Sequence, residues 1–235
     1  MSIACEMKIV KKDFIAGARE AEGTVVIIDV FRAFSTACYC LDGGAKRVLP
    51  VGDVGEALAL KEQLDQPILI GERGGKKLDG FDFGNSPTAL LQMDLRGKEV
   101  IQSTHAGTQG IVTAAHADEI LTGAFVNAKA TAAYIKKKAP AIVTLVRMGW
   151  QAETPTDEDD LYAEYLESLL LDRDFDEQSV FPQLKASPCA ERFFDPAQPW
   201  NPSSDFDLCL RLNAFDFVVT ARKEADELLS LGKVL

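Results

Sequence analysis

Apolar and polar positions along the chain follow two alternating patterns. Short runs of apolar, often β-branched residues recur, and most are followed by a longer stretch with helical spacing. The run TVVIIDV at residues 24–30 is almost wholly apolar, which is typical of a strand buried on both faces of a parallel sheet. The pattern predicts further strands at residues 47–51, 67–71, 98–103, 119–121, 141–148 and 215–220. It predicts helices at residues 33–41, 53–64, 107–117, 127–138, 157–171 and 222–231, the second opened by an Asp53–Glu56 capping box.

This alternation predicts an α/β fold of three layers, α/β/α, with a mostly parallel and possibly mixed central sheet. Two stretches break the pattern. Residues 72–94 are glycine-rich and aperiodic, so we expect a functional loop there. Residues 172–207 carry five prolines among aromatic residues, and we expect this segment to cross the surface irregularly. No repeat is present, so the chain is predicted to be a single domain over residues 1–235.

Composition excludes several classes of function. The chain has 36 acidic and 25 basic side chains, a net charge of −11, which disfavours binding to nucleic acid or to an anionic membrane. Only two histidines occur, His105 and His116, so a zinc site of three imidazoles is excluded, and His116 is expected to be structural. The five cysteines show no CxxC spacing, and no apolar run has the length of a signal peptide or a membrane span. These features predict a cytoplasmic protein with reduced, buried thiols.

Candidate chemistry follows the ends of the predicted strands. Asp29 and Arg32 follow the first strand, and Glu72 and Arg73 follow the strand at 67–71. The loop Ser103-Thr104-His105-Ala106-Gly107-Thr108 follows the next, and the acidic run 157–160 follows the strand at 141–148. If these strands are parallel, their carboxyl ends share one edge of the sheet, where ligands of such folds bind.

The residue types at this edge suit a metal-assisted phosphate site. Carboxylates bind a hard cation such as Mg²⁺ through oxygen. Arginine forks match phosphate oxygens, and a Ser/Thr-rich turn at a helix start offers donors to an anion. Together they predict a Mg²⁺-assisted site for a small anionic phosphomonoester.

Each candidate also has a structural interpretation. Asp29 could cap the following helix, and Glu72 with Arg73 could be a surface pair. Thr156 and Asp159 fit a capping box, which the pattern alone slightly favours over metal binding. His105 stands where a base or proton donor would help, but it could equally be a hydrogen-bonded structural histidine.

Several motifs, in order, carry a family resemblance: IIDVFRAFST, GERGGKKLDGFDFGNSP, STHAGT, the stretch FVNA at 125–128 and the run DED at 157–159. Over about residues 24–170 the chain resembles the 2-phosphosulfolactate phosphatases, and residues 71–87 are the most specific part. The resemblance implies a Mg²⁺-dependent phosphatase that converts 2-phospho-3-sulfolactate to 3-sulfolactate, a step of coenzyme M biosynthesis. Bacterial relatives occur outside that pathway, so the resemblance leaves the physiological substrate open.

The resemblance also implies site residues. Positions shared with the family are Asp29, Arg32, Glu72, Arg73, Asp82, Asn85, Ser86, Gly107, Thr108, Asn127, Glu158 and Asp159. The chain departs from the family at His105-Ala106, where many members have Thr-Asn, which bears on the exact substrate.

We combine both lines of reasoning into one hypothesis. Its metal ligands are Asp29, Glu72, Glu158 and Asp159, and its catalytic residues are Asp29, Arg32, Arg73 and His105. Its substrate-binding residues are Asn85, Ser86, Ser103, Thr104, Gly107, Thr108 and Asn127, with Lys76 or Arg147 for a carboxylate or sulfonate. The attacking group is either a metal-bound water or Asp29 itself.

Two other functions stay open at this stage. The chain could be a sensor that binds a phosphorylated or sulfonated metabolite without hydrolysing it, or a metal-dependent hydrolase of a carboxylate-bearing ester. The aromatic residues of the proline-rich segment, Phe193, Phe194 and Trp200, could cover a neighbouring copy in a homo-oligomer or simply their own sheet.

Overall fold

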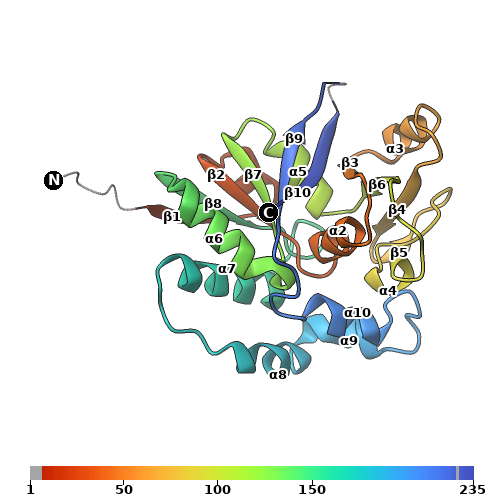
Figure 1. Cartoon of the computed structure of the whole chain (residues 1–235). Coiled ribbons are helices and arrows are strands. Elements are labelled where there is room, and N and C mark those ends of the chain that lie inside the picture. The colour runs from red at the N-terminus through yellow and green to blue at the C-terminus, as the bar shows by residue number, and fades with distance from the viewer. Residues whose placement is uncertain (1–6, 226–227) are drawn as a thin grey trace.

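A computed structural model describes residues 7–225 and 228–235 of the chain. Its described strands form one ten-stranded sheet in the order β1-β8-β2-β7-β9-β10-β3-β6-β4-β5 (Figure 1). The strands are β1 Lys8–Asp13, β2 Thr24–Ile28, β3 Arg47–Pro50, β4 Ile68–Arg73, β5 Lys76–Lys77, β6 Glu99–Ser103, β7 Glu119–Gly123, β8 Ile142–Arg147, β9 Val218–Lys223 and β10 Leu229–Val234. All the strands predicted between residues 24 and 148 are therefore present.

Helices flank this sheet. They are α1 Phe14–Arg19, α2 Ala33–Asp42, α3 Val54–Lys61, α4 Pro87–Leu90, α5 Gly107–Thr113, α6 Ala128–Lys138, α7 Asp157–Leu170, α8 Val180–Lys185, α9 Pro188–Phe194 and α10 Ser203–Cys209, with 3₁₀ turns η1 Phe125–Asn127 and η2 Glu177–Ser179. The Asp53 carboxylate accepts the Glu56 N–H at 2.9 Å, so the predicted cap of α3 is confirmed. None of the helices in the described part of the chain has the length and apolar character needed to cross a membrane.

Strand β2 shows why the fold has three layers. Val25 and Ile27 point into a core shared with α1, α2 and α5, while Val26 and Ile28 point into a core shared with α6 and α7. Successive side chains of a strand face opposite sides of a sheet, so a continuous apolar run needs cover on both sides. The predicted α/β/α layering is confirmed.

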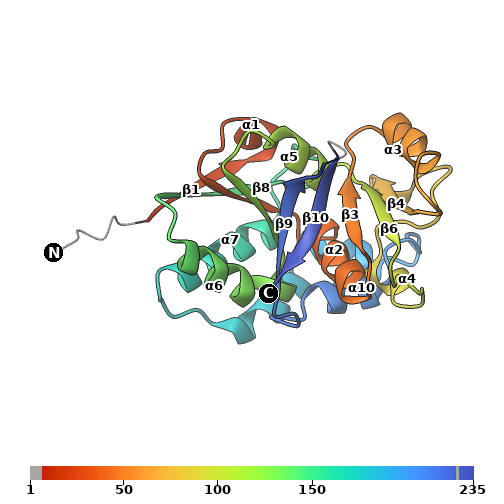
Figure 2. The ribbon, with the colours of Figure 1, turned by 45° about the horizontal axis from the view of Figure 1, so that its top comes forward.

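The direction of the strands differs from the simplest prediction. Strands β1, β8, β2 and β7 form one parallel group, and β3, β6 and β4 form another. The hairpin β9–β10 lies between them and is antiparallel to its neighbour on each side (Figure 2). Three antiparallel steps separate the groups, so in a flat sheet their carboxyl ends would lie on opposite edges.

Sheet twist brings the two groups back together. Neighbouring strands are rotated by roughly 20–25°, so the five steps from β2 to β6 accumulate about 100–125°. The sheet curls around α2, whose buried face packs with residues of both groups in a single core. The carboxyl ends of β2 and β6 therefore meet, although their strands are not parallel to each other.

One prediction near the C-terminus is wrong. The helix expected at residues 222–231 is instead the end of β9 and the first half of β10; residues 226–227 of that range lie outside the described residues. Leu231 and Ser230 are both buried because β10 lies in the middle of the sheet, between β9 and β3. Long-range pairing thus overrides the local helical spacing.

The proline-rich segment at 172–207 is not irregular but contains α8, α9 and α10. Pro188 stands in the first turn of α9 just after the cap Ser187, a position that proline favours. Its aromatic residues partly cover their own core, since Phe193 is buried against Phe31. Of the cysteines, Cys38, Cys40 and Cys209 are buried free thiols, Cys189 is half-buried, and Cys5 lies outside the described residues.

Three other regions differ from the prediction in detail. The stretch 72–94 contains the end of β4, the short strand β5 and helix α4, and is a loop elsewhere. The last predicted strand begins at Val218 rather than at residue 215. Strand β1 and helix α1 were missed, because β1 is an edge strand with four charged residues among its six.

Candidate active site

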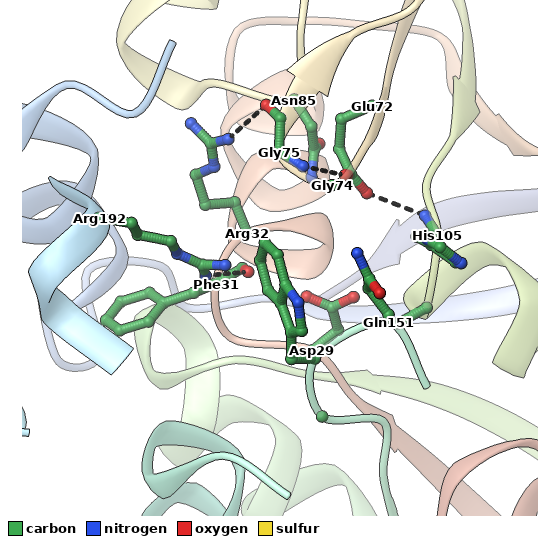
Figure 3. Close-up of a pocket in the computed structure, with 13 residues that line it drawn as sticks. Asp29, Phe31, Arg32, Glu72, Gly74, Gly75, Asn85, His105, Gln151 and Arg192 are labelled. Atoms are coloured by element: carbon green, nitrogen blue, oxygen red, sulfur yellow. Dashed lines mark hydrogen bonds between the residues drawn. The ribbon is translucent and has the colours of Figure 1, made fainter. Parts of the chain in front are cut away.

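A pocket opens where the strand ends meet (Figure 3). It holds about 400 Å³ of empty space, part of it open to solvent. Its lining residues are Asp29, Phe31, Arg32, Glu72, Gly74, Gly75, Asn85, His105, Ala106, Gly149, Trp150, Gln151 and Arg192. The ends of β2, β4, β6 and β8 thus converge with helix α9, and five predicted site residues share one cavity: Asp29, Arg32, Glu72, Asn85 and His105.

Asp29 directly follows β2 and is buried in the pocket wall. Its Oδ1 accepts the N–H of Ala33 at 3.1 Å, which fixes the carboxylate at the start of α2. A Cβ atom at position 107 would lie 2.7 Å from Asp29 Oδ2, so only glycine allows this approach of α5. Burial, assisted by the charges of Glu72 and Glu158, raises the pKa of Asp29 to about 6, which makes the site receptive to a cation.

Glu72 organises the opposite wall. Its Oε1 accepts the main-chain N–H of His105 at 2.9 Å, and its Oε2 accepts the N–H of Gly75 at 2.7 Å (Figure 3). Gly74 and Gly75, with φ of +58° and +81°, join the paired residues Arg73 and Lys76 in a two-residue hairpin turn. Positive φ at both positions is what such a turn requires, which explains the Gly-Gly pair. This hairpin forms part of the pocket wall.

Arg32 reaches the pocket but is bound to the protein. Its Nη1 lies 2.6 Å from Asp205 Oδ2 in a fully buried ion pair and 3.0 Å from the Trp200 carbonyl. The other Asp205 oxygen accepts hydrogen bonds from Ser86 Oγ and from the N–H of Thr88. Asp205, on α10, thus neutralises Arg32 and holds the loop before α4 in place.

Arg73 lies outside the pocket. Its guanidinium donates to the carbonyls of Glu72, Gly52 and Ser103 and to Ser103 Oγ, at 2.7–3.2 Å. The side chain therefore ties β4 to the ends of β3 and β6. In this arrangement Arg73 does not face a ligand in the pocket.

The acidic residues at the start of α7 are buried behind the pocket. Asp159 accepts the N–H of Val30 at 3.0 Å and that of Gly149 at 2.8 Å, so it joins the loops after β2 and β8. Thr156 precedes α7 but makes no side-chain cap, so the predicted capping box is wrong. Glu158 is buried with Oε2 unpartnered among the described residues. Burial raises the pKa of both Glu158 and Asp159.

Most of the predicted substrate-binding residues have structural contacts instead. Asn85 lines the pocket, and its Oδ1 accepts a hydrogen bond from Gln102 at 3.1 Å. The others lie outside the pocket lining: Ser86, Ser103, Thr104, Gly107, Thr108 and Asn127. Thr104 and Thr108 hydrogen-bond to each other, and Asn127 donates to the Phe217 carbonyl beside β9.

The remaining predicted side chains also lie elsewhere. Lys76 lies over the ring of Trp200, and Arg147 pairs with Asp13 and Asp160. Both ring nitrogens of His116 contact main-chain carbonyls, which confirms its structural role.

Eight of the 13 lining residues were not predicted site residues, and three of these eight, Trp150, Gln151 and Arg192, have side chains with hydrogen-bond donors. Trp150 and Gln151 follow β8, where the same rule on strand ends could have found them. Arg192 lies on α9, within the segment expected to be irregular, and no local signal marks it. Only the folded chain brings Arg192 to the pocket.

The carboxylates match one mode of Mg²⁺ binding. Within residues 7–225 and 228–235, no group of three or more His, Cys, Asp or Glu side chains could hold a metal ion, so the four predicted ligands do not form one cluster. However, Mg²⁺ commonly keeps several waters and binds one or two protein carboxylates together with substrate phosphate. Asp29 lines the pocket and its Oδ2 accepts no hydrogen bond from the described residues, so its carboxylate fits that mode.

Comparison with known proteins covers nearly the whole chain. The sequence model of a family described as 2-phosphosulpholactate phosphatase matches residues 10–224, a range that includes every residue of the pocket. A protein of Bacillus subtilis (strain 168) named probable 2-phosphosulfolactate phosphatase is 33% identical over 205 residues, which is 86% of this chain and 88% of that protein.

Two other relatives carry the same name. One from Prochlorococcus marinus is 36% identical over 169 residues, 70% of this chain and 67% of its own. One from Caldicellulosiruptor saccharolyticus is 44% identical over 105 residues, 44% of this chain and 43% of its own.

Proposed function

Since the chain belongs to the 2-phosphosulfolactate phosphatase family, we propose that it hydrolyses 2-phospho-3-sulfolactate to 3-sulfolactate and phosphate, with Mg²⁺ as cofactor. The family membership confirms the resemblance seen in the motifs. The observation that supports the reaction most strongly is the buried, partly unpartnered Asp29 in a pocket that also contains arginine side chains. A carboxylate that can bind a metal ion, next to arginine side chains that can bind phosphate, suits a metal-assisted phosphoryl transfer.

In this proposal each pocket residue has a limited task. Asp29 holds the cation together with Glu72 or Glu158, and the ion when bound supplies positive charge that offsets the charge of the phosphate. Asn85 donates from Nδ2, since Gln102 already occupies its Oδ1. His105 donates a proton to the leaving oxygen of the lactate unit. Glu72 keeps the N–H groups of Gly75 and His105 occupied and so fixes the hairpin.

Hydrolysis breaks the bond between phosphorus and the substrate oxygen, and a water molecule supplies the new oxygen on phosphorus. Either this water attacks directly, or Asp29 attacks first and the water then hydrolyses the aspartyl phosphate. Rapid quench of a turnover mixture followed by mass spectrometry distinguishes the two routes. A phosphorylated peptide containing Asp29 supports the covalent route, and its absence supports direct attack.

Phosphate release from a panel of small phosphomonoesters tests the function. We expect 2-phospho-3-sulfolactate to have the highest kcat/KM, activity to vanish with EDTA, and Mg²⁺ to restore it. Turnover that persists in EDTA contradicts the proposed cofactor. Tight binding of the phosphorylated compound without phosphate release favours the sensor alternative instead.

The biological setting is a separate part of the proposal. A role in coenzyme M biosynthesis and a cytoplasmic location rest on the resemblance and on the composition of the chain. Assembly into a homo-oligomer stays a prediction, which light scattering of the purified protein can test.

A further inference from the structure

Arg192 differs from the other arginines near the pocket. Arg32 is neutralised by Asp205 at 2.6 Å, and Arg73 donates its guanidinium hydrogens to four oxygens outside the pocket. Arg192 lines the pocket, yet among the residues that the structure describes no carboxylate lies within ion-pairing distance of it. The carboxylates of Glu158 and Asp29 act on its charge only from beyond ion-pairing distance.

The direct contacts of Arg192 fix its position without forming an ion pair. Its Nη2 donates to the Phe31 carbonyl at 2.9 Å, in the loop that follows Asp29 (Figure 3). The guanidinium carbon lies 4.6 Å from the centre of the Trp150 ring and 5.1 Å from that of Phe193. Its Nε is buried and has no partner among the described residues.

These contacts leave the edge of the guanidinium for a ligand. Aromatic rings interact with the face of the group, whereas its N–H donors lie in the plane and match the paired oxygens of a phosphate. A buried charge without a partner is costly, and a buried donor without an acceptor adds to that cost. A bound anion that accepts from the edge removes both costs.

Arg192 also borders a second cavity, and the charges there decide on which side an anion binds. That cavity is lined by the acidic residues Asp157 and Glu158, together with Cys189 and Gln198. Like charges would repel an anion from it. The first pocket sets two arginines, Arg192 and Arg32, against two carboxylates, Asp29 and Glu72, and Asp29 is the proposed cation ligand. The second cavity sets Arg192 against Asp157 and Glu158 without a second arginine in its lining.

We propose that Arg192 binds the phosphate group of the substrate, donating from the edge of its guanidinium to the phosphoryl oxygens. This inference rests on the proposed function for the identity of the substrate, but inorganic phosphate, as the product, tests it directly. It assigns the phosphate contact to Arg192 and not to Arg73, which lies outside the pocket. Arg32 lines the same pocket but is already compensated by Asp205.

The test measures binding of inorganic phosphate by isothermal titration calorimetry, in the presence of Mg²⁺, for the wild type, Arg192→Gln and Arg192→Lys. We expect Arg192→Gln to weaken phosphate binding roughly 10- to 100-fold, as when a charge-assisted hydrogen bond to an anion is lost. Arg192→Lys, which keeps the charge but lacks the planar fork, should fall between the two.

Lys185→Gln is the matched control. Lys185 is a cation on the neighbouring helix α8 that lies 5.5 Å from the Phe194 ring centre and 5.9 Å from that of Phe181, outside the pocket. Its loss removes a cation–aromatic contact of the same kind, so phosphate affinity should stay at the wild-type value. Equal losses in Lys185→Gln and Arg192→Gln would mean that Arg192 acts only through packing.

Chemical rescue separates ligand binding from folding. For Arg192→Ala, millimolar guanidinium should restore part of the phosphate affinity, which a purely structural defect would not allow. In steady-state assays, Arg192→Gln should raise the inhibition constant of phosphate and the KM more than it lowers kcat. A circular dichroism spectrum of each variant shows whether it is folded.

The outcomes separate this inference from the proposed function. If the wild type binds phosphate through Arg192 but hydrolyses no phosphomonoester, the inference holds and the proposed function fails. If the enzyme is active while Arg192→Gln keeps wild-type phosphate affinity and KM, the function holds and the inference is overturned. Absence of phosphate binding by the wild type also overturns it.

Discussion

The two walls of the pocket differ in how far their polar groups are satisfied. In the wall formed by Glu72, Gly75 and His105, which we call the hairpin wall, each Glu72 oxygen accepts a main-chain N–H, and Arg73 behind it donates to four oxygens. In the wall formed by Asp29, Gln151 and Arg192, which we call the charged wall, the two charged groups are only partly compensated.

This difference indicates a separate role for each wall. Groups that are already paired, as the Glu72 carboxylate and the Arg73 guanidinium are, gain little from a ligand. The exception in the hairpin wall is His105 Nδ1, which is buried without a partner among the described residues. Partly compensated charges gain most when a cation and an anion arrive together. We therefore infer that the hairpin wall shapes the pocket, whereas the charged wall supplies most of the binding energy.

The largest expected effect is on the charged wall. Asp29→Asn should lower kcat/KM by roughly 10³-fold, equivalent to about 4 kcal/mol, because it removes the carboxylate that we propose as the cation ligand. Phosphate release under saturating Mg²⁺ measures it. Asp53→Asn is the matched control, since asparagine can also cap α3, and its activity should equal that of the wild type. Near-normal turnover of Asp29→Asn would remove Asp29 from the reaction.

The next effect is on the framework around the pocket. Asp205→Asn leaves Arg32 buried without its counterion, while the Asn oxygen can still accept from Ser86 and Thr88. We expect a loss of about 3–5 kcal/mol in the free energy of unfolding, measured in urea. The double variant with Arg32→Gln should lose less than the sum of the single losses. A loss below ~1 kcal/mol would show that the pair matters little for stability.

A smaller effect should distinguish the hairpin wall from the charged wall. Arg73→Ala removes the donors to Gly52 and Ser103, so it should destabilise the fold by about 2–3 kcal/mol. Below its melting temperature, its phosphate affinity should stay within about threefold of the wild type, since one hydrogen bond to an anion is worth more than that. A large loss of phosphate affinity in folded Arg73→Ala would show that Arg73 binds the phosphate. It would contradict the proposal that the hairpin wall shapes the pocket while the charged wall binds the ligand.

The smallest expected effect is a gain in the free energy of unfolding rather than a loss, and it concerns the Asp29 carboxylate. Burial raises the pKa of Asp29 to about 6, whereas an unfolded aspartate has a pKa of about 3.9. Below about pH 4 the Asp29 carboxyl is neutral in both the folded and the unfolded protein. Between about pH 4 and pH 6 it is ionised mainly in the unfolded chain, so the free energy of unfolding falls as the pH rises. Above about pH 6 that penalty is fully present, and Asp29→Asn removes it.

In EDTA at about pH 7, Asp29→Asn should therefore be more stable than the wild type by about 1–3 kcal/mol. The gain should disappear near about pH 4. Urea titrations at both pH values measure it. Equal stabilities of the two proteins at neutral pH would mean that the Asp29 charge is compensated in the fold.

Local patterns in the sequence predict much of the fold. The run at β2 requires cover on both faces, and Asp53 caps α3 through atoms three residues apart. These features depend on neighbours along the chain, so a single sequence contains them. The Gly74-Gly75 turn also depends on neighbours along the chain, but residues 72–94 were expected to be a loop, and the structure shows a hairpin at the pocket.

The candidate site could be predicted in part. Asp29, Glu72 and His105 were found because each follows a strand, and the ends of strands β2, β4 and β6 do meet. These ends do not meet as members of one parallel sheet, as expected, because the strands form two groups antiparallel to each other, which sheet twist brings together. Arg73 was expected at the site because it follows the strand predicted at 67–71. Strand β4 instead includes both Glu72 and Arg73, and adjacent residues of a strand point to opposite faces.

By itself, the sequence determined the family, the alternation of strands and helices, and the carboxylate at the end of β2. The tertiary structure decided what pairs across long separations: β10 as a central strand instead of a helix, Asp205 as the partner of Arg32, and Arg192 at the pocket. The physical reason is the range of the interactions. Spacing and capping act within a few residues, whereas ion pairs and sheet pairing join segments far apart in the chain, and Phe31 contacts Arg192 across 161 positions.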